Sequence, residues 1–182
     1  MKSIDENELH WIPMRVTYGR ELKVQSYLNS IGMQTFIPMK GKQINYSDGT
    51  QDNKLTPAIR NLIFVYSSIK KIKELKSESL KAKPLRFYVK HSIDSSRKEI
   101  LLVPSKQMND FISVVNNSMY EIIFLDRIEK WNEVGKVRIT KGSLIGVEGY
   151  IKRIGRNKKV AVIIDGIAAV ATFVPMDYVE FI

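Results

Sequence analysis

Residues 142–159 read GSLIGVEGYIKRIGRNKK and place three glycines within eight residues, directly before a run of lysine and arginine. Glycine beside positive charge occurs in loops that cradle phosphate, but such loops lie between a strand and the N-terminus of a helix. Neither GxxxxGK[ST] nor GxGxxG occurs in the chain, and no helical periodicity follows Gly149. Gly142, Gly146 and Gly149 are therefore predicted to form turns and bulges of a strongly curved β-sheet.

Short apolar runs rich in β-branched residues surround this stretch, a pattern typical of a small all-β domain. The most apolar part, 160–176, is interrupted by Asp165-Gly166 and is shorter than the roughly 20 residues that a membrane helix needs. It is interpreted as two buried strands joined by a turn, so no membrane segment is predicted. The predicted strands are 137–140, 147–154, 160–164, 168–174 and 179–181. They indicate a small closed or half-closed β-barrel.

The residues before this barrel combine strand and helix signals. Residues 11–17 (WIPMRVT) alternate as in a half-buried strand, and Pro13, which has no N–H, favours an edge or one-sided strand. A helix is predicted over Val24 to Ile31, where Gly32 ends it. Two extended segments, 34–46 and 59–66, flank a turn at 47–49 and a polar loop up to residue 57, which indicates a hairpin.

Two further helices and two further strands complete this part of the chain. Ser67-Ser68 precedes the second helix and Ser105 the third, while 85–90 and 120–125 are predicted strands. The order of elements predicts an α+β fold in which three helices cover a mostly antiparallel sheet. The charged, non-periodic residues 126–134 suit a linker. The predicted organisation is a tail at 1–8, an α/β sandwich at 9–125, the linker at 126–134 and the barrel at 135–182.

The chain of 182 residues carries 29 Lys plus Arg against 19 Asp plus Glu, a net charge of +10. Such an excess favours polyanionic partners, either nucleic acid or an acidic protein complex. Residues 1–133 have 21 basic and 15 acidic groups (+6) and residues 134–182 have 8 and 4 (+4). The second part is therefore the more basic per residue.

The absence of cysteine and the presence of only two histidines, His10 and His91, argue against disulfides, thiolate zinc sites and multi-histidine metal centres. No cofactor or metal is predicted. Acidic residues in MKSIDENELHW stand where a signal peptide needs an apolar core, so a cytoplasmic protein is expected. No recognisable motif frames an acid–base pair, and an enzymatic role is not expected.

Two segments and one motif resemble a known family. Read from Gly135, GKVRITKGSLIGVEGYI resembles the KOW motif, with its valine-rich strand, spaced turn glycines and Gly-x-hydrophobic continuation. WIPMRVTYGRELKVQSYL from Trp11 and AIRNLIFVYSS from Ala58 resemble the N-terminal domain of the NusG family of transcription elongation factors. The two domains in this order cover the chain from about residue 9. The last 17 residues and RNLIFVYSS are similar to the specialised (UpxY-like) antiterminators of bacterial capsular and surface-polysaccharide operons.

This resemblance implies a monomer that binds transcribing RNA polymerase at the clamp of the largest subunits and promotes processive transcription without covalent chemistry. Leu62 and Phe64, two apart on one strand and therefore on one face, fall where the family contacts polymerase. Trp11 borders the same patch. The alternative is that all three are core residues of the sheet.

Three further residues are assigned to polymerase by the resemblance. Arg60-Asn61 stands where the family often has Pro-Gly, so the entry turn is expected to differ and Arg60 to add a charged contact. Ser67 and Ser68 lie near the region where relatives touch the opposite side of the cleft, although the threonine-rich form of that region is missing.

Two groups are candidates for nucleic acid. Arg15, Tyr18 and Arg20 are expected to contact the non-template DNA strand, because arginine suits phosphate and an aromatic ring stacks on bases. The alternative for them is solvated surface. A basic loop is expected to contact nascent RNA, a ribosomal or termination partner, or only water; it comprises Lys152, Arg153, Arg156, Lys158 and Lys159. A second hypothesis follows, an RNA-binding or ribosome-associated KOW protein without polymerase docking.

Overall fold

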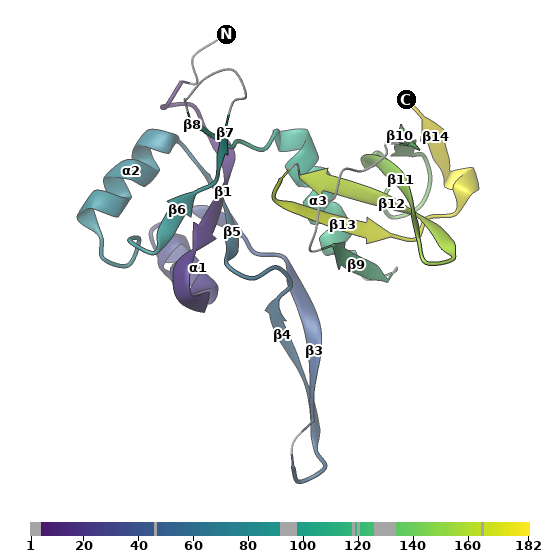
Figure 1. Cartoon of the computed structure of the whole chain (residues 1–182), viewed down its shortest axis with the longest axis horizontal. Coiled ribbons are helices and arrows are strands. Elements are labelled where there is room, and N and C mark those ends of the chain that lie inside the picture. The colour runs from purple at the N-terminus through teal and green to yellow at the C-terminus, as the bar shows by residue number, and fades with distance from the viewer. Residues whose placement is uncertain are drawn as a thin grey trace. The chain divides into compact units, whose positions relative to one another are not determined.

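The computed structural model describes residues 5–45, 47–91, 98–117, 119, 121–125, 134–164 and 166–182 (Figure 1). It is a mixed α/β structure with few helices and many antiparallel strands. The chain divides into two compact units, Met1–Pro104 and Ser105–Ile182. Within the described ranges, no helix is long and apolar enough to cross a membrane.

The first unit is built on a four-stranded antiparallel sheet in the order β2-β5-β1-β6. These strands are β1 (His10–Val16), β2 (Gln34–Phe36), β5 (Leu62–Ser67) and β6 (Leu85–Phe87). Helices α1 (Glu21–Ser30) and α2 (Ile69–Glu78) cover one face. Ile12 and Ile63 from the strands pack there with Leu28 of α1 and Ile72 of α2 in one buried cluster. The predicted antiparallel sheet is therefore present, with two helices in its buried cluster in place of the predicted three, because α3 groups with the second unit.

Of the two positions expected from Pro13, an edge or a one-sided strand, the edge position is wrong, because β1 lies between β5 and β6 in the sheet. The backbone N of Val103 donates to the carbonyl oxygen of Trp11 at 2.9 Å, and β6 pairs only with Met14–Val16. Because alternate residues of a strand direct their backbone groups to the same side, the nitrogen of Pro13 points away from β5, beyond the end of β6. The missing N–H therefore costs no ladder hydrogen bond.

In this unit a side chain caps the start of α2, and a glycine ends α1. The Oγ of Ser68 accepts a hydrogen bond from the N of Lys71 at 3.2 Å at the start of α2. After α1, Gly32 has φ 77° and takes the left-handed conformation of a helix terminator. Ile31, predicted on the buried face of α1, follows the helix and is 43% exposed.

Two hairpins accompany this sheet. Strands β3 (Met39–Asn45) and β4 (Gln51–Pro57) pair along their whole length, so the polar residues predicted as a loop form a strand. In the intervening turn, the N and Oγ1 of Thr50 donate to Asp48 Oδ1 at 2.9 and 2.6 Å. The predicted strand 85–90 is divided between β6 and β7 (Val89–His91), and β7 pairs with β8 (Lys98–Ile100).

The second unit contains one helix and a six-stranded antiparallel sheet in the order β14-β10-β11-β12-β13-β9. Its elements are α3 (Ser105–Val115), β9 (Ile122–Leu125), β10 (Val134–Ile139), β11 (Glu148–Ile154), β12 (Asn157–Ile164), β13 (Ala168–Thr172) and β14 (Val179–Phe181). All five strands predicted from residue 137 onward are present. In the described part of the chain the outer strands β14 and β9 do not pair, so the sheet is open and not a closed barrel.

The boundary between the units differs from the predicted one, because α3 and β9 group with the second unit. Strand β9 pairs with β13, with Phe124 opposite Val170. Helix α3 packs against β12 and β13, and the side-chain Nε2 of Gln107 donates to the carbonyl oxygen of Ile163 at 2.6 Å. Residues 126–133 of the predicted linker lie outside the described residues.

Candidate protein and nucleic-acid interfaces

The three glycines that follow β10 are required for different structural reasons. Gly142 and Gly146 both have φ 84°, a left-handed conformation that side chains rarely adopt. The N of Gly146 donates to the carbonyl oxygen of Ile139 at 2.7 Å and closes the turn. Gly149 lies inside β11, where a Cβ would stand 2.6 Å from the carbonyl oxygen of Ala161. Two glycines are thus placed in a turn and the third at a close approach of two strands.

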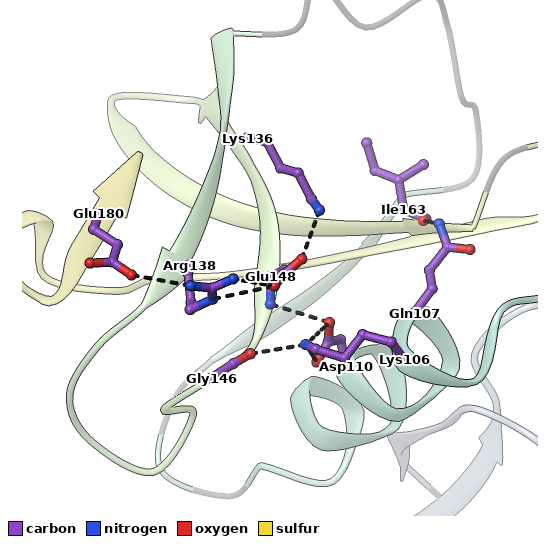
Figure 2. A network of polar contacts seen from close by, with 9 residues as sticks. All are labelled: Lys106, Gln107, Asp110, Lys136, Arg138, Gly146, Glu148, Ile163 and Glu180. Carbon is purple, nitrogen blue, oxygen red and sulfur yellow. Dashed lines mark hydrogen bonds and ion pairs between the residues drawn. The ribbon is translucent and has the colours of Figure 1, made fainter. Parts of the chain in front are cut away.

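The carboxylate of Glu148, the first residue of β11, connects this strand to β10 (Figure 2). Glu148 accepts hydrogen bonds from Lys136 Nζ at 2.7 Å and from Arg138 Nη2 at 2.9 Å, and its side chain is only 16% exposed. These hydrogen bonds, that of Lys136 first, lower the pKa of Glu148 to about 2. Arg138 also forms an ion pair with Glu180 of β14 at 3.5 Å. The cations of β10 are therefore engaged within the sheet.

The same network continues to helix α3 (Figure 2). Lys106 Nζ lies 2.6 Å from both carboxylate oxygens of Asp110 and 2.9 Å from the carbonyl oxygen of Gly146. The N of Glu148 donates to Asp110 Oδ2 at 3.3 Å. These contacts attach α3 to the glycine turn. Sequence reasoning missed them because Asp110 and Glu148 are 38 residues apart.

The five candidate cations of the basic loop lie on the β11–β12 hairpin, where the structure separates them into two sets. Lys159 is 7% exposed, and its Nζ lies 3.9 Å from Glu121 Oε2. Lys152, directly opposite Lys159, is half-buried. Arg153, Arg156 and Lys158 are exposed around the tip. Of the five cations, these last three have exposed side chains.

The predicted DNA contacts Tyr18 and Arg20 come together beside β1. Tyr18 is 86% exposed, and the guanidinium carbon of Arg20 lies 5.5 Å from its ring centroid, a cation–π arrangement. Tyr18 has φ 65°, a conformation that is an outlier for a bulky residue. Arg15 is exposed on β1, opposite Leu62 and Arg86 in the sheet. An exposed aromatic ring on a strained backbone, with a guanidinium near the ring, is an arrangement suited to binding an unpaired base.

Two residues that sequence reasoning missed hold this strained loop. Asn61 also has a positive φ, 61°, and its carbonyl and Oδ1 accept from the N of Val16 at 2.9 Å and of Gly19 at 3.3 Å. Its own N donates to Oε1 of the buried Glu21 at 2.5 Å. The available signal was Asn61 in place of a glycine, since asparagine tolerates the left-handed conformation better than other residues with a Cβ.

The predicted polymerase patch is buried in this structure, contrary to an exposed docking surface. Leu62 and Phe64 have no exposed surface, and Trp11 is 5% exposed with its ring centroid 5.4 Å from that of Tyr66. These side chains lie on the sheet face opposite Ile63, because alternate residues of a strand point to opposite faces. The buried residues of α1 and α2 pack with Ile63, so neither helix covers the Leu62 face.

The remaining predicted polymerase contacts are mostly structural. Ser68 is buried and caps α2, as described above. Ser67 is 2% exposed, and its Oγ finds no hydrogen-bond partner in the described part of the chain. Arg60 alone of these three is exposed, in the turn before β5.

In the part of the chain that the structure describes, no group of three or more His, Cys, Asp or Glu side chains is arranged to hold a metal ion. No protein-family model matches the sequence, and no curated protein is significantly similar to it. Among solved structures, the chain is similar to one described as "Domain interaction in Thermotoga maritima NusG". The two share 18% sequence identity with a TM-score of 0.45, over 98% of this chain and 99% of the other.

Proposed function

We propose that this chain is a transcription elongation factor that binds RNA polymerase and promotes antitermination, specialised for bacterial surface-polysaccharide operons. One observation supports this most. The two N-terminal segments that carry the sequence resemblance are direct partners in the sheet, with His10 opposite Ser67 through to Arg15 opposite Leu62. Residues that are 47 (62 − 15) to 57 (67 − 10) positions apart in the chain thus lie side by side in one sheet, as a shared docking function requires.

The proposed docking surface is the sheet face that contains Leu62, Phe64 and Trp11. Both helices of the first unit pack on the other face, so neither helix would have to move for this apolar face to meet a second protein surface. Because Leu62 and Phe64 are fully buried here, binding requires the face to become uncovered. Binding would then favour the polymerase conformation that this surface fits, and no bond is made or broken.

Contacts to the non-template strand are proposed at Tyr18 and Arg20, with Arg15 and Arg60 as further cations. Stacking of one base on an aromatic ring contributes about 1–3 kcal/mol and tolerates any sequence. The proposed protein acts in the cytoplasm as a monomer without a cofactor. Operon choice would have to come from additional contacts to polymerase or DNA.

The docking face is tested with two substitutions on one strand. Leu62→Ala and Ile63→Ala remove buried side chains on opposite faces of β5, and each costs about 2–5 kcal/mol of stability. At a temperature where both variants are folded, Leu62→Ala should lose polymerase affinity and pause suppression, whereas Ile63→Ala should keep them. Equal behaviour of the two variants in a polymerase-binding assay would contradict docking through the Leu62 face.

A second candidate function is an RNA-binding KOW protein that does not dock to polymerase. The exposed cations Arg153, Arg156 and Lys158 favour it. Direct RNA binding with steep salt dependence, together with no effect on purified polymerase, would select this function over the first.

A further inference from the structure

The end of the β11–β12 hairpin concentrates positive charge more than any comparable strand pair in the described chain. Residues 149–164 contain no acidic side chain and five basic ones, of which Arg153, Arg156 and Lys158 are exposed. Gly155, with φ 63°, makes the tight turn that brings these three together. No ion pair joins any of them to another residue that the structure describes.

The pairing of the strands places like charges against each other. Arg153 stands directly opposite Lys158, and Lys152 directly opposite Lys159. Like charges at directly opposed positions destabilise an antiparallel pair. Lys159 is compensated by Glu121, whereas the Arg153–Lys158 pair has no acidic neighbour on the hairpin. An anion bound between Arg153 and Lys158 would remove this repulsion.

The chemistry of the tip favours phosphate over an acidic protein surface. Protein interfaces have an apolar or aromatic core inside a polar rim. Residues 153–158 are Arg, Ile, Gly, Arg, Asn and Lys, and the one apolar side chain, Ile154, packs against the buried cluster of Ala161 and Ile163. No aromatic ring lies in this segment to stack on bases. The tip therefore offers cations alone, which suit a phosphodiester backbone.

We propose that Arg153, Arg156 and Lys158 at the tip of the β11–β12 hairpin bind the phosphates of a nucleic-acid backbone without reading its sequence. Lys159 and Lys152 have a supporting role in the hairpin. The site does not depend on polymerase docking. Nascent RNA and upstream DNA present the same phosphodiester chemistry, and the experiment below distinguishes between them.

The test is fluorescence anisotropy with the full chain and three labelled probes of about 20 nucleotides per strand: an RNA duplex, a DNA duplex and single-stranded RNA. In Arg153→Gln/Arg156→Gln/Lys158→Gln, the affinity for nucleic acid should fall at least about tenfold. The negative slope of log K against log salt should become shallower by about 2 to 3, because three phosphate contacts are lost. The probe that the wild type binds most tightly identifies whether the phosphates belong to RNA or to DNA.

The matched control is Lys40→Gln/Lys42→Gln/Lys54→Gln on the β3–β4 hairpin. It removes the same charge from another exposed hairpin, in which Lys42 stands opposite Lys54. This control should retain nearly all of the affinity. If it loses as much as the tip variant, binding reflects net charge alone and the proposal is overturned. Failure of the wild type to bind any probe at low salt overturns it as well.

A functional role is separated from a structural one by Lys158→Glu. This change converts an opposed like-charged pair into an opposite-charged one, so the unfolding midpoint should stay equal or rise while nucleic-acid affinity falls. A lowered midpoint with unchanged affinity would assign Lys158 to folding instead. Because no polymerase is present, failure of this test leaves polymerase docking standing. Equal polymerase binding by Leu62→Ala and Ile63→Ala would contradict docking and would leave this site standing.

Discussion

At the scale of single residues, Gly149 is tightly constrained, because β11 passes close to β12 there. The Cβ of an alanine would lie 2.6 Å from the carbonyl oxygen of Ala161, so the backbone must shift. We expect Gly149→Ala to lower the free energy of unfolding by about 1–3 kcal/mol, as overpacking does. Urea unfolding measures this loss.

The control is Gly41→Ala in β3, where no atom lies within 4 Å of the added Cβ and φ is not positive. This change should be nearly neutral. Equal losses for the two variants would show that glycine is needed at 149 for strand flexibility and not for the close approach.

Asn61 carries the second residue-scale prediction, because its positive φ and its side chain both support the loop of Tyr18. Asn61→Ala places an ordinary side chain in the left-handed region and should cost about 1–2 kcal/mol. Asn61→Gly keeps the conformation available and should cost less, although the hydrogen bond from the N of Gly19 is lost. Thermal unfolding compares the two variants. If alanine were tolerated better than glycine, left-handed strain at residue 61 would be contradicted.

At the scale of elements, the ionised carboxylate of Glu148 on β11 accepts hydrogen bonds from Lys136 and Arg138 and so connects β11 to β10. The pKa of Glu148 is about 2 in the fold against its usual value of 4.5, so the folded state favours the charged form. The resulting stability is complete above pH 4.5 and is lost as pH falls from 4.5 towards 2. Glu148→Gln should therefore lower stability at pH 7, by about 1 kcal/mol, and flatten the acid limb of the stability curve.

The comparison variant is Glu180→Gln, which removes a weaker partner of Arg138 whose side chain is 51% exposed. It should change the pH dependence little. Unfolding midpoints measured between pH 7 and pH 3 check both variants. An unchanged acid limb in Glu148→Gln would mean that other carboxylates control acid unfolding.

Elements that depend on local signals could be predicted from the sequence. Ser68 as a helix cap, Gly32 as a helix terminator and Asp48-Gly49 in a turn act through hydrogen bonds or dihedral angles of neighbouring residues. The polar strand β4 could not be predicted, because it is stabilised by pairing with β3 and not by an apolar face. The pattern of 120–125 predicted a strand, which the structure has as β9 (Ile122–Leu125), but carried no information on which sheet it joins.

The candidate sites show the same division between local and non-local information. Tyr18, Arg20 and Arg153 are exposed, as is usual for residues of loops and hairpin tips. The burial of Leu62 and Phe64 did not follow from their alternation, because an apolar strand face serves a core or a docking surface equally well. The role of Glu21 depends on Asn61, 40 residues away.

At the scale of the whole molecule, the second unit needs α3 and β9. Strand β13 pairs with β9 on one side, and every β13 residue is buried. A fragment of residues 105–182 should therefore unfold cooperatively, whereas a fragment of 135–182 leaves the β13 edge and the α3-facing surface exposed to water. Circular dichroism melting and amide-proton dispersion compare the two fragments.

The two fragments decide where the folding boundary of the second unit lies. A cooperative transition in 105–182 alone would place the folding boundary at Pro104/Ser105. A transition of the same sharpness and midpoint in 135–182 would contradict a stabilising role of α3 and β9, and would support the boundary predicted from the sequence.

The central claim, that this chain acts on transcribing RNA polymerase, is tested most directly with purified polymerase halted on a DNA template. The protein should bind the elongation complex saturably at one copy per polymerase and shorten the lifetime of a defined pause. Tyr18→Ala should reduce the effect on pausing more than it reduces binding, since one stacking contact contributes only about 1–3 kcal/mol. A folded wild-type protein that neither binds this complex nor changes the pause lifetime would contradict the account.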